Sequence, residues 1–193
     1  MTIVFTMPEM AQKRLLELYR NGGAYLEYGS GGSTIAALNS PSISSVISVD
    51  TSADWLNKII ENISNGSLKK FTPCHIEVGE LMAWGRPKSE SHIKNWKNYI
   101  YKPWFIQKSK GISPDLVLID GRFRISCFYA SVFFSKPGTK ILIDDYVDRP
   151  NYHQIEKILP ITNLYGRLAE FTAPTTKSDL LIFNMLDTMY DSD

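Results

Sequence analysis

Apolar positions along the chain follow two spacings, one typical of helices and one typical of buried strands. Short apolar runs alternate with longer segments of helical spacing, and this alternation predicts an α/β domain with a parallel sheet. The clearest strand is Asp115–Asp120, DLVLID, which is apolar on both faces as a central parallel strand should be. A buried helix is predicted at Phe123–Phe134, and a further strand, TKILIDD, at Thr139–Asp145.

The same spacings predict the elements on either side of this central part. Asn21-Gly22-Gly23 ends the first helix, and Thr51/Ser52 are residue types that favour a helix start. In chain order these elements are a helix at Pro8–Tyr19, a strand at Ala24–Tyr28, a short helix at Thr34–Asn39, a strand at Ser44–Val49, a helix from Thr51/Ser52 that Asn65-Gly66 stops, a strand at His75–Val78 and a helix near Tyr152–Leu159.

The last part of the chain predicts an antiparallel hairpin. Two strands are expected at Ile161–Phe171 and Asp179–Met185, and the segment TAPTTKS between them is too short for a crossover helix. The least regular part is Gly79–Gly111, where we expect a loop and one helix that is broken or begins at Pro103. The whole pattern predicts a doubly wound, mostly parallel seven-stranded sheet with a C-terminal antiparallel hairpin and helices on both faces, in a single domain over residues 1–193.

Composition narrows the class of protein. The 193 residues suffice for one domain, and 44% hydrophobic with 21% charged residues is ordinary for a soluble globular protein. The net charge of +1 predicts neither a nucleic-acid nor an anionic membrane surface, and no apolar run approaches the roughly 20 residues that span a bilayer. The N-terminus lacks an export signal, so we expect a cytoplasmic protein. The oligomeric state stays open, a homo-oligomer included.

The two cysteines carry no sign of a disulfide or a zinc site. Cys74 and Cys127 are far apart and have no CxxC or Cys/His spacing. We expect both to be small, buried apolar residues.

Acidic residues and glycines follow four of the predicted strands. Gly29 follows the first strand, Asp50 the second, Asp120-Gly121 the fourth and Asp144-Asp145 the fifth. The carboxyl ends of parallel strands meet at one edge of a sheet, and doubly wound sheets bind their ligands there. The sequence therefore predicts one functional cluster at that edge.

The stretch YLEYGSGGSTIAAL joins the first strand to the helix that follows it. Gly29 and Gly31 supply the first two glycines of a dinucleotide-binding G-x-G-x-x-G motif, but Thr34 stands at the third position. Glu27 precedes the turn and disfavours a pyrophosphate, because two anions repel each other in a low-dielectric cleft. The turn favours a ligand with a positive centre, hydroxyl groups and an amino group. The alternative is a plain β-to-α turn with a solvated glutamate.

Asp50 stands at the end of the second strand, at the distance from the glycines where an acid commonly binds a ribose. A carboxylate suits a ribose because it accepts two hydroxyl hydrogen bonds at once. The alternative is that Asp50 caps the helix that begins at Thr51/Ser52.

Three motifs, YLEYGSGGST, VISVD and DLVLIDGRFR…KILIDDY, resemble the successive motifs of class I S-adenosylmethionine-dependent methyltransferases. The resemblance covers roughly residues 24–185. It implies a seven-stranded sheet whose last strands form an antiparallel hairpin, with S-adenosylmethionine as the cofactor. It also implies methyl transfer to an oxygen or nitrogen of a small-molecule or glycan-type acceptor.

The resemblance implies roles for the residues that match its motifs. Asp50 would accept the ribose hydroxyls, Gly79-Glu80 would lie near the adenine, and Asp120 would face the transferred methyl group or the acceptor. The expected cofactor-binding residues are Glu27, Gly29, Ser30, Gly31, Ser33, Asp50, Thr51, Gly79 and Asp120, and the expected catalytic residues are Asp120, Arg122, Asp144 and Asp145.

A divalent metal ion is a further hypothesis. IDG and IDDY are similar to a methyltransferase subgroup in which carboxylates after the fourth and fifth strands hold such an ion. Asp120, Asp144 and Asp145 offer the oxygen ligands that Mg²⁺ prefers. Arg122 and Arg124 stand where members of the subgroup often carry an Asp-His pair, and guanidinium groups could neutralise the aspartates instead. They could also hold an anionic substrate group, although an ion pair within the domain is favoured for Arg124.

Two other functions stay open. One is a module of the same fold that binds the cofactor without catalysis, which the missing Asp-His pair favours slightly. The other is a nicotinamide-dependent oxidoreductase, against which Thr34 and Glu27 count. His153 is a candidate general base, although a lone His is more often a surface or helix-start residue. A group of aromatic residues could form a lid or a substrate wall, although such residues more often cover a sheet edge or fill an interface: Trp84, Trp96, Tyr99, Tyr101 and Trp104.

Overall fold

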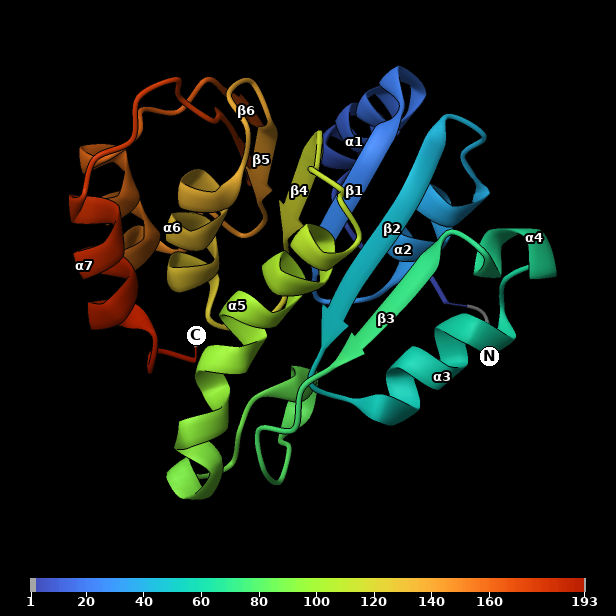
Figure 1. The fold of residues 1–193 in the computed structure, drawn as a ribbon, viewed down its shortest axis with the longest axis horizontal. Coiled ribbons are helices and arrows are strands. Elements are labelled where there is room, and N and C mark those ends of the chain that lie inside the picture. The colour runs from blue at the N-terminus through green and yellow to red at the C-terminus, as the bar shows by residue number, and fades with distance from the viewer. Residues whose placement is uncertain (1–2, 193) are drawn as a thin grey trace.

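The computed structural model describes residues 3–192, which form a seven-stranded sheet between two layers of helices (Figure 1). The strand order is β3-β2-β1-β4-β5-β7-β6. The chain builds the sheet outward from β1 to one side and then from β4 to the other, so the switch point lies between β1 and β4. The first five strands are parallel, whereas β7 runs antiparallel to both β5 and β6. The predicted fold class is therefore confirmed. The strands are β1 Gly23–Tyr28, β2 Ile43–Asp50, β3 Phe71–His75, β4 Leu116–Ile119, β5 Lys140–Ile143, β6 Asn163–Tyr165 and β7 Leu168–Thr172.

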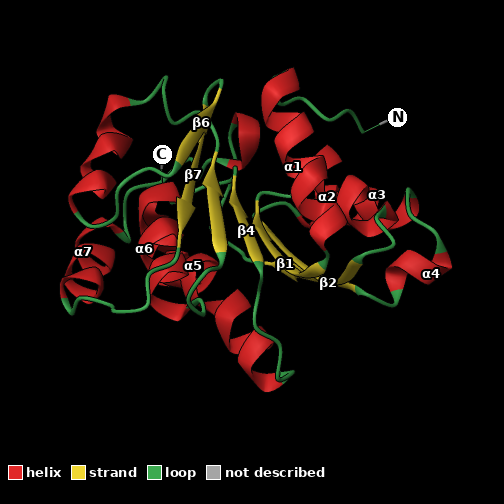
Figure 2. Ribbon diagram, turned by 90° about the horizontal axis from the view of Figure 1, so that it is seen from above, coloured by secondary structure: helices red, strands yellow, loops and turns green. Residues whose placement is uncertain are grey.

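The helices cover both faces of this sheet (Figure 2). Residues of α1, α2 and α3 pack with one face, and residues of α5, α6 and α7 pack with the other. Alternate residues of β4 divide between the two layers: Leu116 and Leu118 face the first, Val117 and Ile119 the second. The helices are α1 Glu9–Asn21, α2 Gly32–Asn39, α3 Ala53–Glu61, α4 Asn65–Leu68, α5 Ile93–Ser109, α6 Arg124–Phe134 and α7 Leu180–Thr188, with 3₁₀ helices η1 Ala83–Gly85, η2 Glu90–His92 and η3 Pro150–Lys157.

The structure bears on two expectations from the composition, one about the cysteines and one about membrane-spanning segments. Cys74 and Cys127 are both buried and unpaired, as predicted. Within residues 3–192, no helix is long and apolar enough to cross a membrane.

The third strand lies earlier than predicted. It spans Phe71–His75 and pairs with residues 46–50 of β2, so the predicted strand His75–Val78 is wrong. Pro73 lies inside β3, and this is tolerated because β3 is an edge strand. Ile76 and Val78 are buried although they lie beyond the strand, which explains why their apolar pattern misled the prediction.

The C-terminal hairpin also has different bounds. Its strand β6 and all but the last residue of β7 lie within the predicted single strand Ile161–Phe171, joined by a tight turn with Gly166 at φ 64°. The predicted strand Asp179–Met185 is instead part of α7, where Leu181 and Met185 are buried at helical spacing. The helical spacing of its buried residues, rather than its apolar content, distinguishes a helix from a strand in this segment.

The irregular segment contains one long helix. α5 runs through Pro103 without ending, so the break predicted there is wrong. Its buried residues recur at helical spacing on both sides of the proline, and this packing outweighs the lost backbone hydrogen bond. Asn65-Gly66 was also misjudged, because α4 begins there, capped by the side chain of Ser64. The predicted helix near Tyr152–Leu159 is the 3₁₀ helix η3.

Candidate functional site

A cleft of about 1080 Å³ opens at the carboxyl ends of the parallel strands. The predicted cluster is present in it, since Gly29, Asp50, Asp120 and Asp145 all line the cleft. Its lining comprises residues 3–7, 29–33, 50–52, 82–86 and 120–122, together with Trp55, Lys58, Tyr99, Arg124, Asp145, Arg149 and Arg167.

The glycine turn brings bare backbone to the wall of the cleft. Gly29 has a φ of 93°, and a Cβ there would lie 2.7 Å from Cα of Gly121, so the turn packs directly against the end of β4. A Cβ on Gly31, in contrast, would meet nothing within 4 Å. The N–H of Gly31 donates to Oγ1 of Thr34 at 2.8 Å, which starts α2. The residue that departs from the dinucleotide motif therefore caps the helix.

Glu27 lies beneath the turn and does not line the cleft. Its side chain is fully buried and accepts hydrogen bonds from the hydroxyls of Tyr25, Ser33, Thr34 and Ser48. Burial raises the pKa of Glu27 to about 7, against the effect of these donors. Strand alternation turns its side chain under the turn, where it holds the loop together, and its expected role in cofactor binding stays a prediction. The solvated glutamate of the alternative interpretation is excluded.

Asp50 lines the cleft and is half-buried. Its Oδ2 accepts from the N–H of Ser30 and its Oδ1 from the N–H of Ser52, both at 2.9 Å. The helix cap falls to Ser52, whose hydroxyl accepts from the N–H of Trp55 at 3.2 Å. Each carboxylate oxygen keeps a second lone pair, so Asp50 can still accept ligand hydroxyls. Burial raises its pKa, and the backbone donors oppose this.

The loop after β3 contributes different residues from those expected. Gly79 does not line the cleft, because it packs against His92. Residues 82–86 line it instead, and Oγ1 of Thr51 donates to the carbonyl of Gly85 at 2.9 Å. Trp84 is 89% exposed in a left-handed conformation. The sequence signal for this loop was the Trp-Gly pair inside a segment without helical or strand spacing.

Only part of the predicted aromatic group reaches the cleft. Trp84 and Tyr99 line it, whereas Trp96 and Trp104 are buried in the core. His153 is likewise outside the lining and contacts the backbone carbonyl of Tyr146. The chain therefore offers no support for His153 as a base in this cleft.

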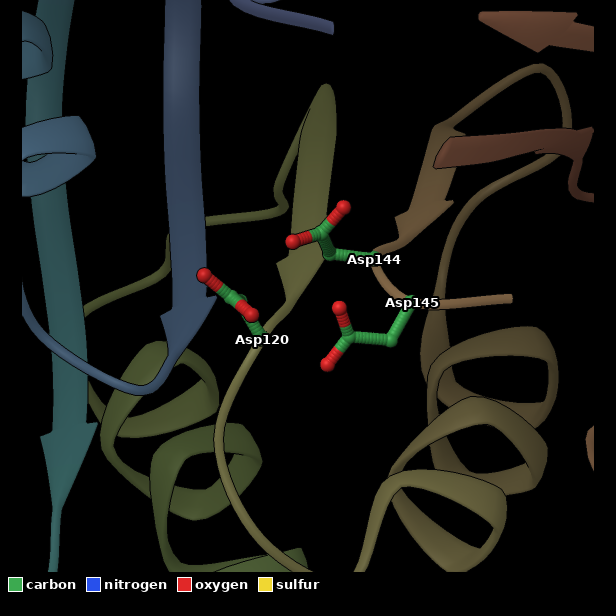
Figure 3. A group of neighbouring side chains, drawn as sticks. All are labelled: Asp120, Asp144 and Asp145. Atoms are coloured by element: carbon green, nitrogen blue, oxygen red, sulfur yellow. The ribbon is translucent and has the colours of Figure 1, made fainter. Parts of the chain in front are cut away.

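Three carboxylates gather at the ends of β4 and β5 (Figure 3). Oxygen atoms of Asp120, Asp144 and Asp145 all lie within 4.8 Å of one another. Asp145 has a φ of 57°, a conformation that turns the chain immediately after β5. The predicted acidic cluster is thus assembled as the strand ends suggested.

Arginines neutralise this cluster. Arg167 binds Asp144 through two hydrogen bonds and also contacts Asp145 at 3.1 Å. Arg124 contacts Asp120 at 3.3 Å and Asp145 at 3.1 Å, and Arg149 contacts Asp145 at 3.5 Å. The ion pair that the sequence favours for Arg124 is present. The sequence reasoning missed Arg149 and Arg167, which lie far along the chain from the motifs.

These contacts do not fit a metal centre. Both oxygens of Asp144 and both oxygens of Asp145 already contact guanidinium groups. A divalent cation would need carboxylate oxygens free of such partners and would be repelled by the three neighbouring guanidinium charges. The three aspartates therefore do not form a Mg²⁺ site in this arrangement.

Asp120 differs from its two neighbours. It lines the cleft with its side chain 29% exposed, whereas Asp144 is completely buried outside the lining. Burial raises the pKa of Asp120 to about 7, Arg124 opposes the rise, and Asp144 and Asp145 add to it. Asp120 is therefore a carboxylate of the cleft whose pKa is raised towards neutral pH.

No protein-family model matches the sequence, and no curated protein matches it. Solved structures do. A methyltransferase-like protein from Silicibacter pomeroyi DSS-3 is 29% identical over 98% of both chains, with a TM-score of 0.82. The cofactor-bound protein Rv0187 from MTB is 15% identical over 90% of this chain and 84% of the other, with a TM-score of 0.59. The C-terminal domain of precorrin-6Y C5,15-methyltransferase from Rhodobacter capsulatus is 11% identical over 89% and 92%, with a TM-score of 0.53.

The sheet order and the cleft at its carboxyl edge define a doubly wound α/β protein with a ligand site at the switch point. Together with these similarities, they show that the chain has the class I S-adenosylmethionine-dependent methyltransferase fold. The resemblance found in the sequence motifs is thereby confirmed.

Proposed function

We propose that this chain is an S-adenosylmethionine-dependent methyltransferase that acts on an oxygen or nitrogen of a small-molecule or sugar-type acceptor. The observation that carries the proposal is that the unobstructed backbone at Gly31 and the carboxylate of Asp50 line the same cleft. The similarity to the methyltransferase-like protein from Silicibacter pomeroyi supports it. The net charge of +1 favours a small acceptor over a nucleic acid.

The cofactor would be held by the first half of the cleft. Backbone atoms of Gly29–Ser33 would contact it, and Asp50 would accept hydroxyl hydrogen bonds with the lone pairs that Ser30 and Ser52 leave free. When bound, S-adenosylmethionine supplies a methyl group on a positively charged sulfur. Glu27 supports the loop from below, through its bonds to Ser33 and Thr34.

The acceptor would lie against the second half of the cleft. Asp120 is suited to take a proton from an acceptor hydroxyl or ammonium group, because its pKa of about 7 matches neutral solution. Arg124 orients Asp120, since its guanidinium also donates to the carbonyls of Gly121 and Asp144. Asp144 is a positioning residue, buried and held by Arg167, whereas Asp145 lines the cleft and is held by Arg124, Arg149 and Arg167.

Calorimetry tests the binding half of the proposal. S-adenosylhomocysteine should bind the protein, and NAD(H) should not. Asp50→Ala should weaken this affinity by about 1–3 kcal/mol, the scale of hydrogen bonds to a charged group. Asp54→Ala is the matched control, because Asp54 is exposed on the neighbouring helix α3 outside the cleft. Equal affinities of wild type and folded Asp50→Ala would remove Asp50 from the cofactor site, and binding of NAD(H) alone would favour the oxidoreductase.

A transfer assay tests the catalytic half. The protein is mixed with S-adenosylmethionine labelled on the methyl group and with a metabolite extract, and label is sought in new products. Asp120→Asn should lose most of the transfer while keeping its affinity for S-adenosylhomocysteine. Tight binding without transfer to any fraction would instead support the non-catalytic module of the same fold.

A further inference from the structure

One guanidinium in the cleft has no partner. Nε of Arg122 is buried and makes no hydrogen bond, and Arg122 forms no ion pair with the residues that the structure describes. Arg124, Arg149 and Arg167, which also line the cleft, each contact at least one aspartate. Arg122 is therefore the unmatched cation of the cluster.

The position of Arg122 links it to the acceptor half of the cleft. It lines the cleft and follows Asp120-Gly121 directly, two residues from the proposed base. Gly121 packs against Gly29, so the side chain of Arg122 begins where the glycine turn ends. Its backbone is held as well, because the N–H of Arg122 donates to the hydroxyl of Tyr99 at 3.3 Å.

The protein itself does not compensate this charge. The carboxylate nearest in sequence, Asp120, contacts Arg124 instead, and Asp144 and Asp145 contact Arg124, Arg149 or Arg167. Burial lowers the pKa of Arg122 and the charge of Arg124 adds to this, the direction expected of a cation without a counter-ion. Leaving a buried N–H of a charged group unpaired costs free energy.

We propose that the methyl acceptor carries a carboxylate or phosphate group and that the guanidinium of Arg122 binds this group. The inference rests on the proposed methyl transfer. A planar guanidinium donates two parallel hydrogen bonds to either anion, which fixes orientation as well as adding affinity. With the anionic end held at Arg122, the nucleophilic end of a small acceptor would lie near Asp120, where its proton can be taken. An interior of about 1080 Å³ exceeds the roughly 300–1,000 Å³ typical of one ligand, so a second small molecule has room.

The test measures anion binding directly and does not need the acceptor. Inorganic phosphate and acetate are titrated separately into the complex with S-adenosylhomocysteine, at constant ionic strength, and followed by NMR. We expect saturable binding of at least one anion, weakened about 10- to 100-fold in Arg122→Gln and less in Arg122→Lys. The anion that binds more tightly shows whether the anionic group of the acceptor is a carboxylate or a phosphate. Arg20→Gln is the control, because Arg20 is exposed at the end of α1, outside the cleft.

Two results would overturn the inference. The first is equal anion affinity in wild type and Arg122→Gln, or no saturable binding of either anion. The second is a loss of S-adenosylhomocysteine affinity in Arg122→Gln, which would assign Arg122 to the carboxylate of the cofactor. Failure of the protein to bind S-adenosylhomocysteine at all would contradict the proposed function itself, and calorimetry detects this before any anion is added.

Discussion

Arg167 holds the carboxylate of Asp144 by two hydrogen bonds, 3.1 Å from Nε to Oδ1 and 2.7 Å from Nη2 to Oδ2. Arg167 lies in the turn between β6 and β7, and Asp144 follows β5. The antiparallel pairing of β5 with β7 brings the two together. The C-terminal hairpin therefore does more than close the sheet, because it supplies the cation that neutralises the most deeply buried aspartate.

The ion pairs of these aspartates predict that methyl transfer does not depend on a metal ion. We expect exhaustive treatment with EDTA to leave methyl transfer unchanged, because Arg124, Arg149 and Arg167 already occupy the oxygens that a divalent cation would need. Added Mg²⁺ should leave the Tm unchanged at constant ionic strength. A clear rise in Tm with Mg²⁺ that Asp145→Asn abolishes would contradict the expectation.

Removing the cation of the pair should destabilise the fold. Arg167→Met leaves the carboxylate of Asp144 buried without a partner, so the free energy of unfolding should fall by about 3 kcal/mol. Because Arg167 is 34% exposed, water offsets part of the loss, and this value is at the low end for breaking a buried ion pair. Urea denaturation measures the change. Lys13→Met is the control, because its ion pair with Glu9 is largely exposed and should contribute much less to stability.

The double variant separates the charge from the packing. Arg167→Met with Asp144→Leu removes both charges and should recover part of the lost stability. If the double variant were less stable than Arg167→Met alone, the buried charge would not be the cause.

Arg167 also shows where sequence reasoning ends. The meeting of Asp50, Asp120 and Asp145 in one cleft could be predicted, because each directly follows a strand of clear apolar pattern. The contact of Arg167 depends on which residues form the hairpin. The apolar run Asp179–Met185 predicts the second strand of the hairpin, which leaves Ile161–Phe171 as the first. The turn at Gly166 lies in the middle of that first predicted strand, so the sequence pattern does not reveal it.

The same distinction applies to side-chain direction. Glu27 was correctly placed next to the glycine turn, but strand alternation points it under the turn and away from the cleft. Pro103 does not break α5 as predicted, because a well-packed helix tolerates a proline that local rules exclude. Local chemistry predicted which loops form the site, and tertiary packing decided which side chains face it.

Two glycines of the turn should respond differently to alanine. Gly31→Ala should leave the Tm nearly unchanged, because the backbone there is extended and the added Cβ meets no atom within 4 Å. Its Cβ would stand in the cleft, so the affinity for S-adenosylhomocysteine should fall. Gly29→Ala should lower the Tm, since its φ is 93° and the Cβ would lie 2.7 Å from the backbone of Gly121.

Thermal denaturation and calorimetry on both variants check this contrast. A Gly31→Ala that binds S-adenosylhomocysteine as tightly as wild type would show that this backbone does not contact the ligand, and a destabilised Gly31→Ala would show that the backbone there does not tolerate a Cβ.

The stability of the protein should fall as the pH rises from about 5 to about 7.5. Burial raises the pKa of Glu27 from 4.5 to about 7, so between these values the folded state binds more protons than the unfolded state. Stability decreases with pH wherever the folded state holds the extra proton, and Glu27 can account for up to about 3 kcal/mol. In Glu27→Gln this part of the slope should disappear, because the amide does not titrate. Urea denaturation at a series of pH values measures the slope.

Asp120 must be separated from Glu27, because its pKa is also raised to about 7 and the charge of Glu27 adds to this rise. Asp120→Asn should reduce the slope by less, since Asp120 is 29% exposed and Glu27 is completely buried. The two variants also differ in a second measurement: Asp120→Asn should lose most of the methyl transfer at every pH, whereas Glu27→Gln should retain it, because the amide oxygen still accepts hydroxyl hydrogen bonds under the glycine turn. An unchanged slope in Glu27→Gln would show that the carboxylate under the turn is ionised throughout this pH range, with its four hydroxyl donors outweighing burial.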